Sequence, residues 1–185
     1  MNKRVLVSGY KAHELGIFNE QHPGIAIIKK ALTDRLLSLL DQGLEWVIVS
    51  GQLGVETWAV ECVWELQEDY PELQYAVITP FLDQQANWND EKKEMYEQII
   101  AMSDYSVSLT NKPYEAPWQF VEKNKFLLRN SDALLLVYDE ENEGSPKFIK
   151  QMAAQLAETT EYELLTITAD DLQLIAEDLQ REQWE

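Results

Sequence analysis

Two hydrophobic periodicities alternate along the 185-residue chain. Short apolar runs lie at residues 4–8, 46–49, 74–79, 105–109, 133–138 and 163–167, bounded by glycine, proline or polar residues, as is typical of buried strands. Between them, apolar residues recur at helical spacing, as at Ile28, Leu32, Leu36 and Leu39. Six strands alternating with six helices predict a three-layer, Rossmann-like α/β fold. We expect an open, mostly parallel sheet with helices on both faces, in a single domain over residues 1–185.

The run from Trp46 to Glu61, WVIVSGQLGVETWAVE, joins a strand, a turn with two glycines and the start of a helix. This turn follows the carboxyl end of a strand, where open parallel sheets bind ligands. Gly51 and Gly54, with Gln52 between them, allow a phosphate to approach backbone amides at a helix N-terminus. Glu56 either accepts hydrogen bonds from ribose hydroxyls or interacts only with the helix dipole. The alternative is a tight turn without a ligand, because this G-x-x-G spacing matches neither the Rossmann nor the Walker motif.

Three further strand ends carry candidate ligand-binding residues. They are Ser8, Gly9, Tyr10 and Lys11 after the first strand, Pro80, Phe81 and Trp88 after the third, and Gly144 and Ser145 after the fifth. The long loop over residues 10–24 is either a binding loop or a solvated excursion. Phe81 and Trp88 either sandwich a flat ring or fix their loop. Ser145 before Pro146 predicts a helix N-cap, which can also bind a second phosphate.

A polar pair, Lys123 and Asn124, lies in the segment 114–130, in which Pro117 marks the predicted start of a helix. Asn124 shares a face with Phe120, Leu127 and Leu128, so we expect it to be buried and hydrogen-bonded to backbone or to a ligand. Lys123 is expected to be solvated. Both residues are candidates for the ligand site.

Composition narrows the function classes. The 33 acidic and 15 basic residues give a net charge of −18, which argues against nucleic-acid binding. Cys62 is the single cysteine and falls on an apolar helix stripe, so we expect a core residue. His13 and His22 share one loop without a further ligand at metal-binding spacing, and the acidic run 139–143 would suit Mg²⁺ only if its carboxylates converged. No metal site is expected. The N-terminal segment is expected to be a strand rather than a signal peptide, which favours a cytoplasmic protein without membrane insertion.

Five segments resemble the YpsA family of small bacterial proteins. They are SGY with EL (8–10 and 14–15), SGQLGVETWAVE (50–61), PF followed by Trp88, QFVEKN (119–124) and YDEENEGSPK (138–147). The resemblance implies membership of a wider Rossmann-like group with the DprA/Smf proteins, the Lonely-guy phosphoribohydrolases and the molybdenum-cofactor carrier proteins. It also implies a pocket for a nucleotide or nucleotide-derived ligand and a link to cell division in Gram-positive bacteria.

Departures from the enzymes of this group are informative. Lonely-guy enzymes carry an Arg-Lys pair and the motif P-G-G-x-G-T-x-x-E, whereas this chain has Lys123-Asn124 and EGSPKF. Phosphoribohydrolase activity is therefore not expected. DprA-like proteins have Arg-Asn, which Asn124 matches, but the net charge argues against single-stranded DNA. We expect a nucleotide-ligand sensor or binding protein with a possible division-protein partner. The alternatives are a hydrolase of an N-glycosidic or phosphate bond that uses Glu56, and an interaction module with a vestigial pocket.

Overall fold

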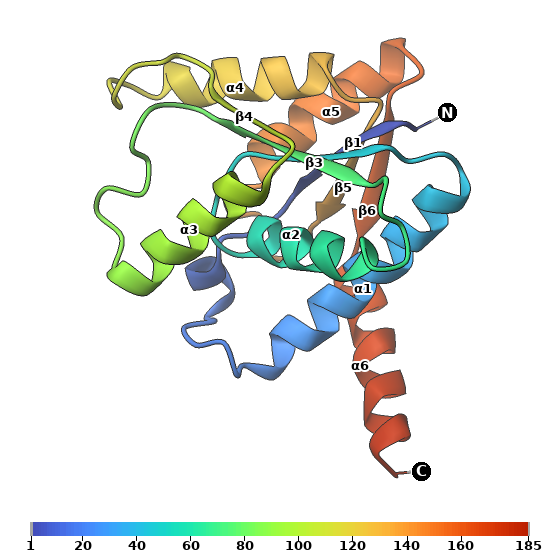
Figure 1. Ribbon diagram of the computed structural model, residues 1–185. Coiled ribbons are helices and arrows are strands. Elements are labelled where there is room, and N and C mark those ends of the chain that lie inside the picture. The colour runs from blue at the N-terminus through green and yellow to red at the C-terminus, as the bar shows by residue number, and fades with distance from the viewer. Residues whose placement is uncertain (1, 185) are drawn as a thin grey trace.

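The computed structural model describes residues 2–184 and shows an open α/β sheet (Figure 1). Six parallel strands lie in the order β4-β3-β2-β1-β5-β6 among these residues. They are β1 Arg4–Ser8, β2 Trp46–Val49, β3 Gln74–Thr79, β4 Tyr105–Ser108, β5 Ala133–Val137 and β6 Glu163–Ile167. The predicted three-layer, Rossmann-like architecture is confirmed.

Six α-helices and one short 3-10 helix connect and follow the strands. They are η1 Ala12–Leu15, α1 Pro23–Asp41, α2 Val55–Leu66, α3 Asp90–Met102, α4 Trp118–Arg129, α5 Lys147–Thr159 and α6 Ala169–Trp184. Side-chain caps fix several starts: His22 Nδ1 accepts a hydrogen bond from the Gly24 amide, and the Asn89 side chain accepts one from the Lys92 amide. Within residues 2–184, no helix is both long enough and apolar enough to cross a membrane.

The helices divide unequally between the two faces of the sheet. Helices α1, α2, α3 and α6 cover one face, and α4 and α5 cover the other (Figure 1), in agreement with the two hydrophobic clusters to which their side chains belong. All five residues of β5 are buried, and the strand lies between β1 and the edge strand β6. Alternate residues of β5 join the two separate hydrophobic clusters, as expected for a strand between two helix layers.

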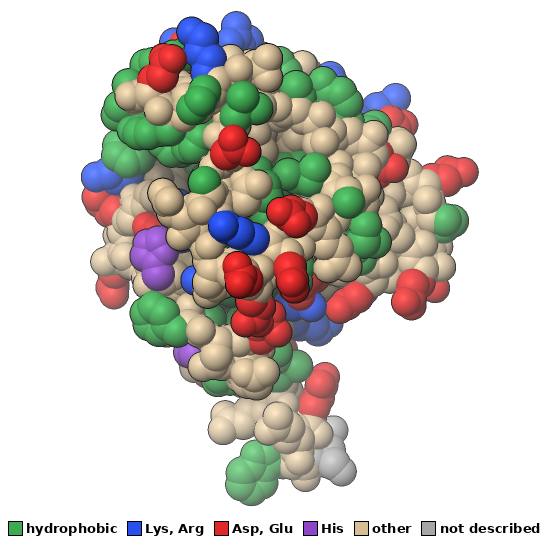
Figure 2. Space-filling model, turned by 60° about the vertical axis from the view of Figure 1, so that its left-hand side comes forward, with side chains coloured by type: hydrophobic (Ala, Val, Ile, Leu, Met, Phe, Trp, Pro, Cys, Tyr) green, Lys and Arg blue, Asp and Glu red, His purple; other side chains and the backbone are tan. Residues whose placement is uncertain are grey.

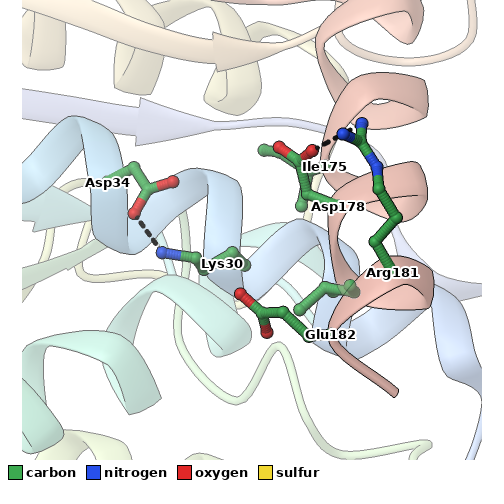
Figure 3. Close-up of a pocket in the computed structure, with 7 residues that line it drawn as sticks. Lys30, Asp34, Ile175, Asp178, Arg181 and Glu182 are labelled. Carbon is green, nitrogen blue, oxygen red and sulfur yellow. Dashed lines mark hydrogen bonds and ion pairs between the residues drawn. The ribbon is translucent and has the colours of Figure 1, made fainter. Parts of the chain in front are cut away.

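Two cavities lie away from the candidate ligand residues. One, of about 580 Å³, lies on the α4 side of the sheet, where two helices leave part of β2, β3 and β4 uncovered; its walls include Ile48, Ala76 and Phe126. The other, of about 390 Å³, separates α1 from α6 (Figure 3). The ion pairs Lys30–Asp34 and Arg181–Asp178 lie along its walls.

The strand order places the candidate residues at one edge. β1 pairs with β2 on one side and with β5 on the other, so chain order reverses at β1. Because all strands are parallel, the segments after β1, β2, β3 and β5 leave the sheet at the same edge. This reversal is the position at which open α/β sheets form a ligand crevice.

Cys62 provides a test of the core on the α2 side. Its side chain is buried, and burial raises the pKa of the thiol to about 11. At pH 8 the thiolate fraction is about a hundredfold lower than for a thiol with a pKa of 9. We predict that iodoacetamide leaves the folded protein unmodified over hours at pH 8 and alkylates it promptly in urea, as measured by intact mass. Equal rates in the two states would contradict this packing.

Candidate functional site

The turn between β2 and α2 is closed by the side chain of Glu56. This carboxylate accepts hydrogen bonds from the amide and the hydroxyl of Ser50; Ser50 Oγ lies 3.0 Å from both carboxylate oxygens. The backbone of Gln52 also stabilises the charged form of Glu56. Only 6% of Glu56 is exposed. The Glu56 carboxylate therefore occupies part of the turn at which the sequence predicts an anionic ligand.

Gly54 is required at this turn because the loop after β1 passes directly against it. A Cβ atom on Gly54 would lie 2.5 Å from the Tyr10 carbonyl oxygen, and the residue has a φ of +118°. The Val55 amide donates a hydrogen bond to that carbonyl over 3.1 Å, and the Ala12 amide donates to the Leu53 carbonyl over 3.3 Å. The first amide of α2 therefore has a backbone partner.

Gln84 covers the other glycine of this turn. Its Nε2 donates to the Ser50 carbonyl over 3.0 Å, and its Oε1 accepts from Gln52 Nε2 over 3.2 Å. A Cβ atom on Gly51 would lie 2.6 Å from Gln84 Nε2. The loop after β3 is thus bonded to the loop after β2, so the two loops form one wall of the edge.

The start of α5 also contains a carboxylate of the protein. Glu14 accepts hydrogen bonds from the Ser145 amide over 2.8 Å, the Ser145 hydroxyl over 2.6 Å and the Lys11 amide over 2.9 Å. The predicted Ser145 N-cap is wrong: the cap residue is Pro146, which has no side-chain cap bond. The physical reason is that the Ser145 hydroxyl bonds to Glu14 from the loop after β1.

Tyr10 connects the end of β1 to the loop after β5. It is 2% exposed, and its hydroxyl accepts a hydrogen bond from the Asp139 amide over 2.9 Å and contacts the Asn142 carbonyl. A Cβ atom on Gly144 would lie 2.9 Å from the Tyr10 ring. Tyr10 therefore offers little surface to a ligand. Ser8 and Gly9, just before it, are half-buried.

Two predictions for α4 are wrong. Lys123, expected to be solvated, is 9% exposed, and Asn124, expected to be buried, is only half-buried. The face that packs inward contains Gln119, Lys123 and Leu127, which lie four residues apart and share one side of a helix. The first two residues of this face, Gln119 and Lys123, are polar, so apolar periodicity indicates the neighbouring face instead.

The Lys123 side chain is buried, but its ammonium group has no acidic or hydrogen-bonding partner in the described chain. Among residues 2–184 it forms no hydrogen bond or ion pair, and burial lowers its pKa, an effect opposed by the nearby charge of Glu56 and reinforced by Lys11. Burial in turn raises the pKa of Glu56, against the charge of Lys123. The enclosed side-chain atoms without a partner in the described chain are Gln85 Oε1 and Ser108 Oγ. Lys123 Nζ is not one of them, so part of its surface is open.

Lys123, Lys11 and Glu56 form the charged group at this edge, which we call the lysine pair and its carboxylate. Two ammonium groups beside one carboxylate suit an anionic group that is joined to hydrogen-bond donors. Within residues 2–184, no three His, Cys, Asp or Glu side chains converge as metal ligands. On the face in Figure 2, lysine and arginine side chains are scattered among acidic ones, so any attraction for an anion is local.

The remaining sequence candidates lie in the loop after β3. Pro80 is buried and Phe81 is half-buried. Phe81 contacts Tyr114 and Phe120, whereas Trp88 packs edge-on against Tyr96 with ring centroids 5.2 Å apart. Phe81 and Trp88 therefore have different aromatic partners. Tyr114 and Phe120 were missed by sequence reasoning, because nothing local indicates that residue 114 returns to the loop after β3.

The fold defines a Rossmann-like α/β protein with glycine turns and a buried lysine at the carboxyl edge of a parallel sheet. Comparison with known proteins is more specific. The chain belongs to the YpsA family: the family model, described as "YspA SLOG family", matches residues 5–172. It is 62% identical to a UPF0398 protein of Lysinibacillus sphaericus over 179 residues, 97% of this chain and 100% of the relative. It is 49% identical to UPF0398 protein YpsA of Bacillus subtilis over 176 residues, 95% and 98% of the two chains.

The contribution of Glu14 to the stability of the protein should depend on pH. Burial alone would raise the pKa of its carboxyl group, but hydrogen bonds from Ser145 and Lys11 outweigh burial and lower it. The lowered pKa means that the stabilisation is present above the ordinary pKa near 4.5 and is lost as pH falls through the pKa of the folded state. We predict that Glu14→Gln lowers the free energy of unfolding by about 1 kcal/mol at pH 7, a value reduced for partial exposure.

Urea denaturation at pH 7 and at pH 3 measures this effect. The difference between wild type and Glu14→Gln should shrink at the lower pH. Glu20→Gln, an exposed substitution in the same loop, should change stability by less than about 0.5 kcal/mol at both pH values. A Glu14→Gln effect that is equal at the two pH values would show that the carboxylate charge does not contribute.

Proposed function

We propose that this chain is a cytoplasmic sensor or binding protein for a nucleotide or nucleotide-derived ligand. The observation that carries the proposal is the buried Lys123 ammonium group, which forms no hydrogen bond or ion pair within residues 2–184. Removing an ion from water costs several kcal/mol, in order of magnitude, unless hydrogen bonds compensate. An anionic ligand would provide the missing partner. Perturbed groups of this kind cluster at functional sites.

The lysine pair and its carboxylate also limit the chemistry of the ligand. A bare phosphate would be attracted by Lys123 and Lys11 but repelled by Glu56. A phosphate attached to a sugar avoids part of this conflict, because ribose hydroxyls can donate hydrogen bonds to the carboxylate. The amides of Ser50 and Val55 have partners within the protein. In this proposal the two lysines, rather than the amides of the turn, supply the charge that attracts the anion.

The cellular role that we attach to binding is regulatory. The resemblance to YpsA-like proteins links the chain to bacterial cell division, so a division protein is the proposed partner. In such a sensor, ligand occupancy would alter the loops after β1, β2 and β5, which are bonded to one another at this edge.

Replacement of Lys123 tests the proposal. We predict that Lys123→Met weakens nucleotide binding at least tenfold, because a charge-assisted hydrogen bond contributes about 1.5–3 kcal/mol. Isothermal calorimetry with a panel of nucleoside mono- and diphosphates measures the affinity. Mass spectrometry of small molecules retained on gently purified protein identifies the natural ligand. Lys125→Met is the matched control, since Lys125 is exposed on the same helix and its ion pair within residues 2–184 is with Glu122.

Two outcomes would overturn the proposal. One is equal nucleotide affinity in Lys123→Met and wild type, which would remove Lys123 from the site. The other is wild-type protein that retains no small molecule and binds no member of the panel. A loss of affinity in Lys125→Met as large as in Lys123→Met would indicate a general charge effect rather than a local anchor.

A second function is favoured by the position of Glu56, a buried carboxyl group at the glycine turn and close to Lys123, where burial raises its pKa. A carboxyl group that stays protonated to higher pH is suited to general acid catalysis, as in a hydrolase of an N-glycosidic or phosphate bond. For a binding protein, we predict that neither wild type nor Glu56→Gln hydrolyses the nucleotide panel, as followed by chromatography. Turnover by wild type that Glu56→Gln abolishes, with binding retained, would establish the hydrolase instead.

A further inference from the structure

An aromatic cluster lies at the same edge of the sheet, over its β3–β4 half. The ring centroids of Phe81 and Tyr114 are 5.0 Å apart, those of Phe81 and Phe120 are 5.4 Å apart, and those of Tyr114 and Phe120 are 6.0 Å apart. The three rings come from the loop after β3, the loop after β4 and the first turn of α4. We call them the aromatic cluster.

Gln119 fixes the loop that carries Tyr114. This side chain is fully buried, and its Oε1 accepts hydrogen bonds from the Glu115 amide over 2.6 Å and the Ala116 amide over 3.1 Å. Its Nε2 donates to Thr110 Oγ1 and to the Pro113 carbonyl, each over 3.1 Å. A buried amide with all its groups bonded in this way holds the loop in one conformation.

The loop after β4 is also bonded to the loop after β3. The Leu82 amide donates to the Lys112 carbonyl over 2.8 Å, and Thr110 Oγ1 donates to the Pro80 carbonyl over 2.9 Å. Phe81 lies between these two links in the sequence. The cluster is therefore preorganised, which reduces the conformational entropy that a ligand would have to remove on binding.

Lys123 connects the aromatic cluster to the charged group. Its Nζ lies 5.6 Å from the centroid of the Phe120 ring, within the range of a cation–π contact. The same ammonium group is influenced by the charges of Glu56 and Lys11. The rings and the lysine pair with its carboxylate are thus neighbours along one edge, with Lys123 between them.

Part of the cluster is open to solvent. Tyr114 is 51% exposed, although its ring belongs to the cluster, and Phe81 and Phe120 are half-buried. Figure 2 shows hydrophobic side chains gathered in the upper part of the visible face, at the height of α4 in Figure 1. An exposed ring in a fixed position offers a stacking surface to a flat ring, and the neighbouring Lys123 offers a charge to an anionic group of the same molecule.

We propose that Phe81, Tyr114 and Phe120 form the subsite for a flat aromatic ring of the ligand whose anionic group binds Lys123. This inference rests on the proposed function and specifies it: the ligand carries a base or a similar ring, and Tyr114 is the residue that selects it. Trp88, paired with Tyr96, is outside this subsite.

Two probes test the subsite: adenosine monophosphate, which carries an adenine base, and ribose 5-phosphate, which has the same sugar phosphate without the base. Calorimetry should show that wild type binds adenosine monophosphate at least fivefold more tightly than ribose 5-phosphate. The reason is that stacking of a base on an aromatic side chain raises affinity by about fivefold or more. Tyr114→Ala should remove this preference while leaving the affinity for ribose 5-phosphate unchanged. Tyr114→Leu, which keeps apolar packing without an aromatic face, should behave in the same way if the Ala variant fails to fold.

Tyr105→Ala is the matched control. Tyr105 is the same residue type with nearly the same exposure, 53%, but it begins β4 and so lies at the opposite edge of the sheet. It should retain the wild-type preference for the ring. A preference that survives in Tyr114→Leu or that is lost equally in Tyr105→Ala would overturn the subsite.

Other outcomes distinguish a failure of the aromatic subsite from a failure of the proposed nucleotide binding. If wild type binds both probes equally, the subsite is overturned while the anion anchor stands. A further outcome is that wild type binds adenosine through Tyr114 and binds adenosine monophosphate no more tightly than adenosine, with no binding of ribose 5-phosphate. In that case the subsite stands, and the anion anchor at Lys123 is overturned. Absence of binding for adenosine monophosphate, ribose 5-phosphate and adenosine contradicts both.

Discussion

The buried Glu56 carboxylate is the interaction on which the ligand edge depends. It accepts both hydrogen bonds that Ser50 can donate, and so it sets the path of the chain from β2 into α2. It is also the opposite charge that acts on Lys123. A buried carboxylate is stabilised when it accepts good hydrogen bonds, whereas a buried ammonium group without hydrogen bonds has a large desolvation free energy. Glu56 thus makes the position of Lys123 tolerable without neutralising it directly.

Glu14 repeats this arrangement at the second helix start. Helix N-termini at strand ends are common seats for phosphate, and here a carboxylate of the protein bonds to Ser145 at that place. The contact joins residues 131 positions apart, so it fixes the loop after β1 against the loop after β5. Both turns are therefore held by hydrogen bonds within the protein. The positive charge available to an incoming anion at this edge then comes from side chains, above all from the buried Lys123.

Much of the fold was predictable because it depends on local patterns. The β5 segment has no polar residue, which indicates burial on both faces, and Gly54 marks a turn that no other residue could form. The order of strands then collected the candidate residues at one edge. Burial on α4 was not predictable from apolar spacing, since Gln119 and Lys123 are polar residues on the inward face.

The partners of single side chains were the least predictable. Ser145 has the sequence context of an N-cap, yet its hydroxyl bonds to Glu14, which only the folded chain brings near. Likewise, Phe81 was paired with Trp88 by proximity in sequence, whereas Tyr114 meets Phe81 because Thr110 and Gln119 bend the loop after β4 toward it. Such contacts arise from tertiary structure, and local propensity contains no record of them.

The net charge of −18 bears on which anions can reach Lys123. Repulsion between exposed charges is largely screened beyond about 8–10 Å at physiological ionic strength, so a small anion meets it only near the surface. A polymeric anion such as nucleic acid would place many phosphates within that distance of acidic side chains, with few lysines to offset them. A recessed ammonium on an acidic protein therefore selects a small ligand over a polymer that bears the same chemical groups. The burial that makes Lys123 costly is also what makes it selective.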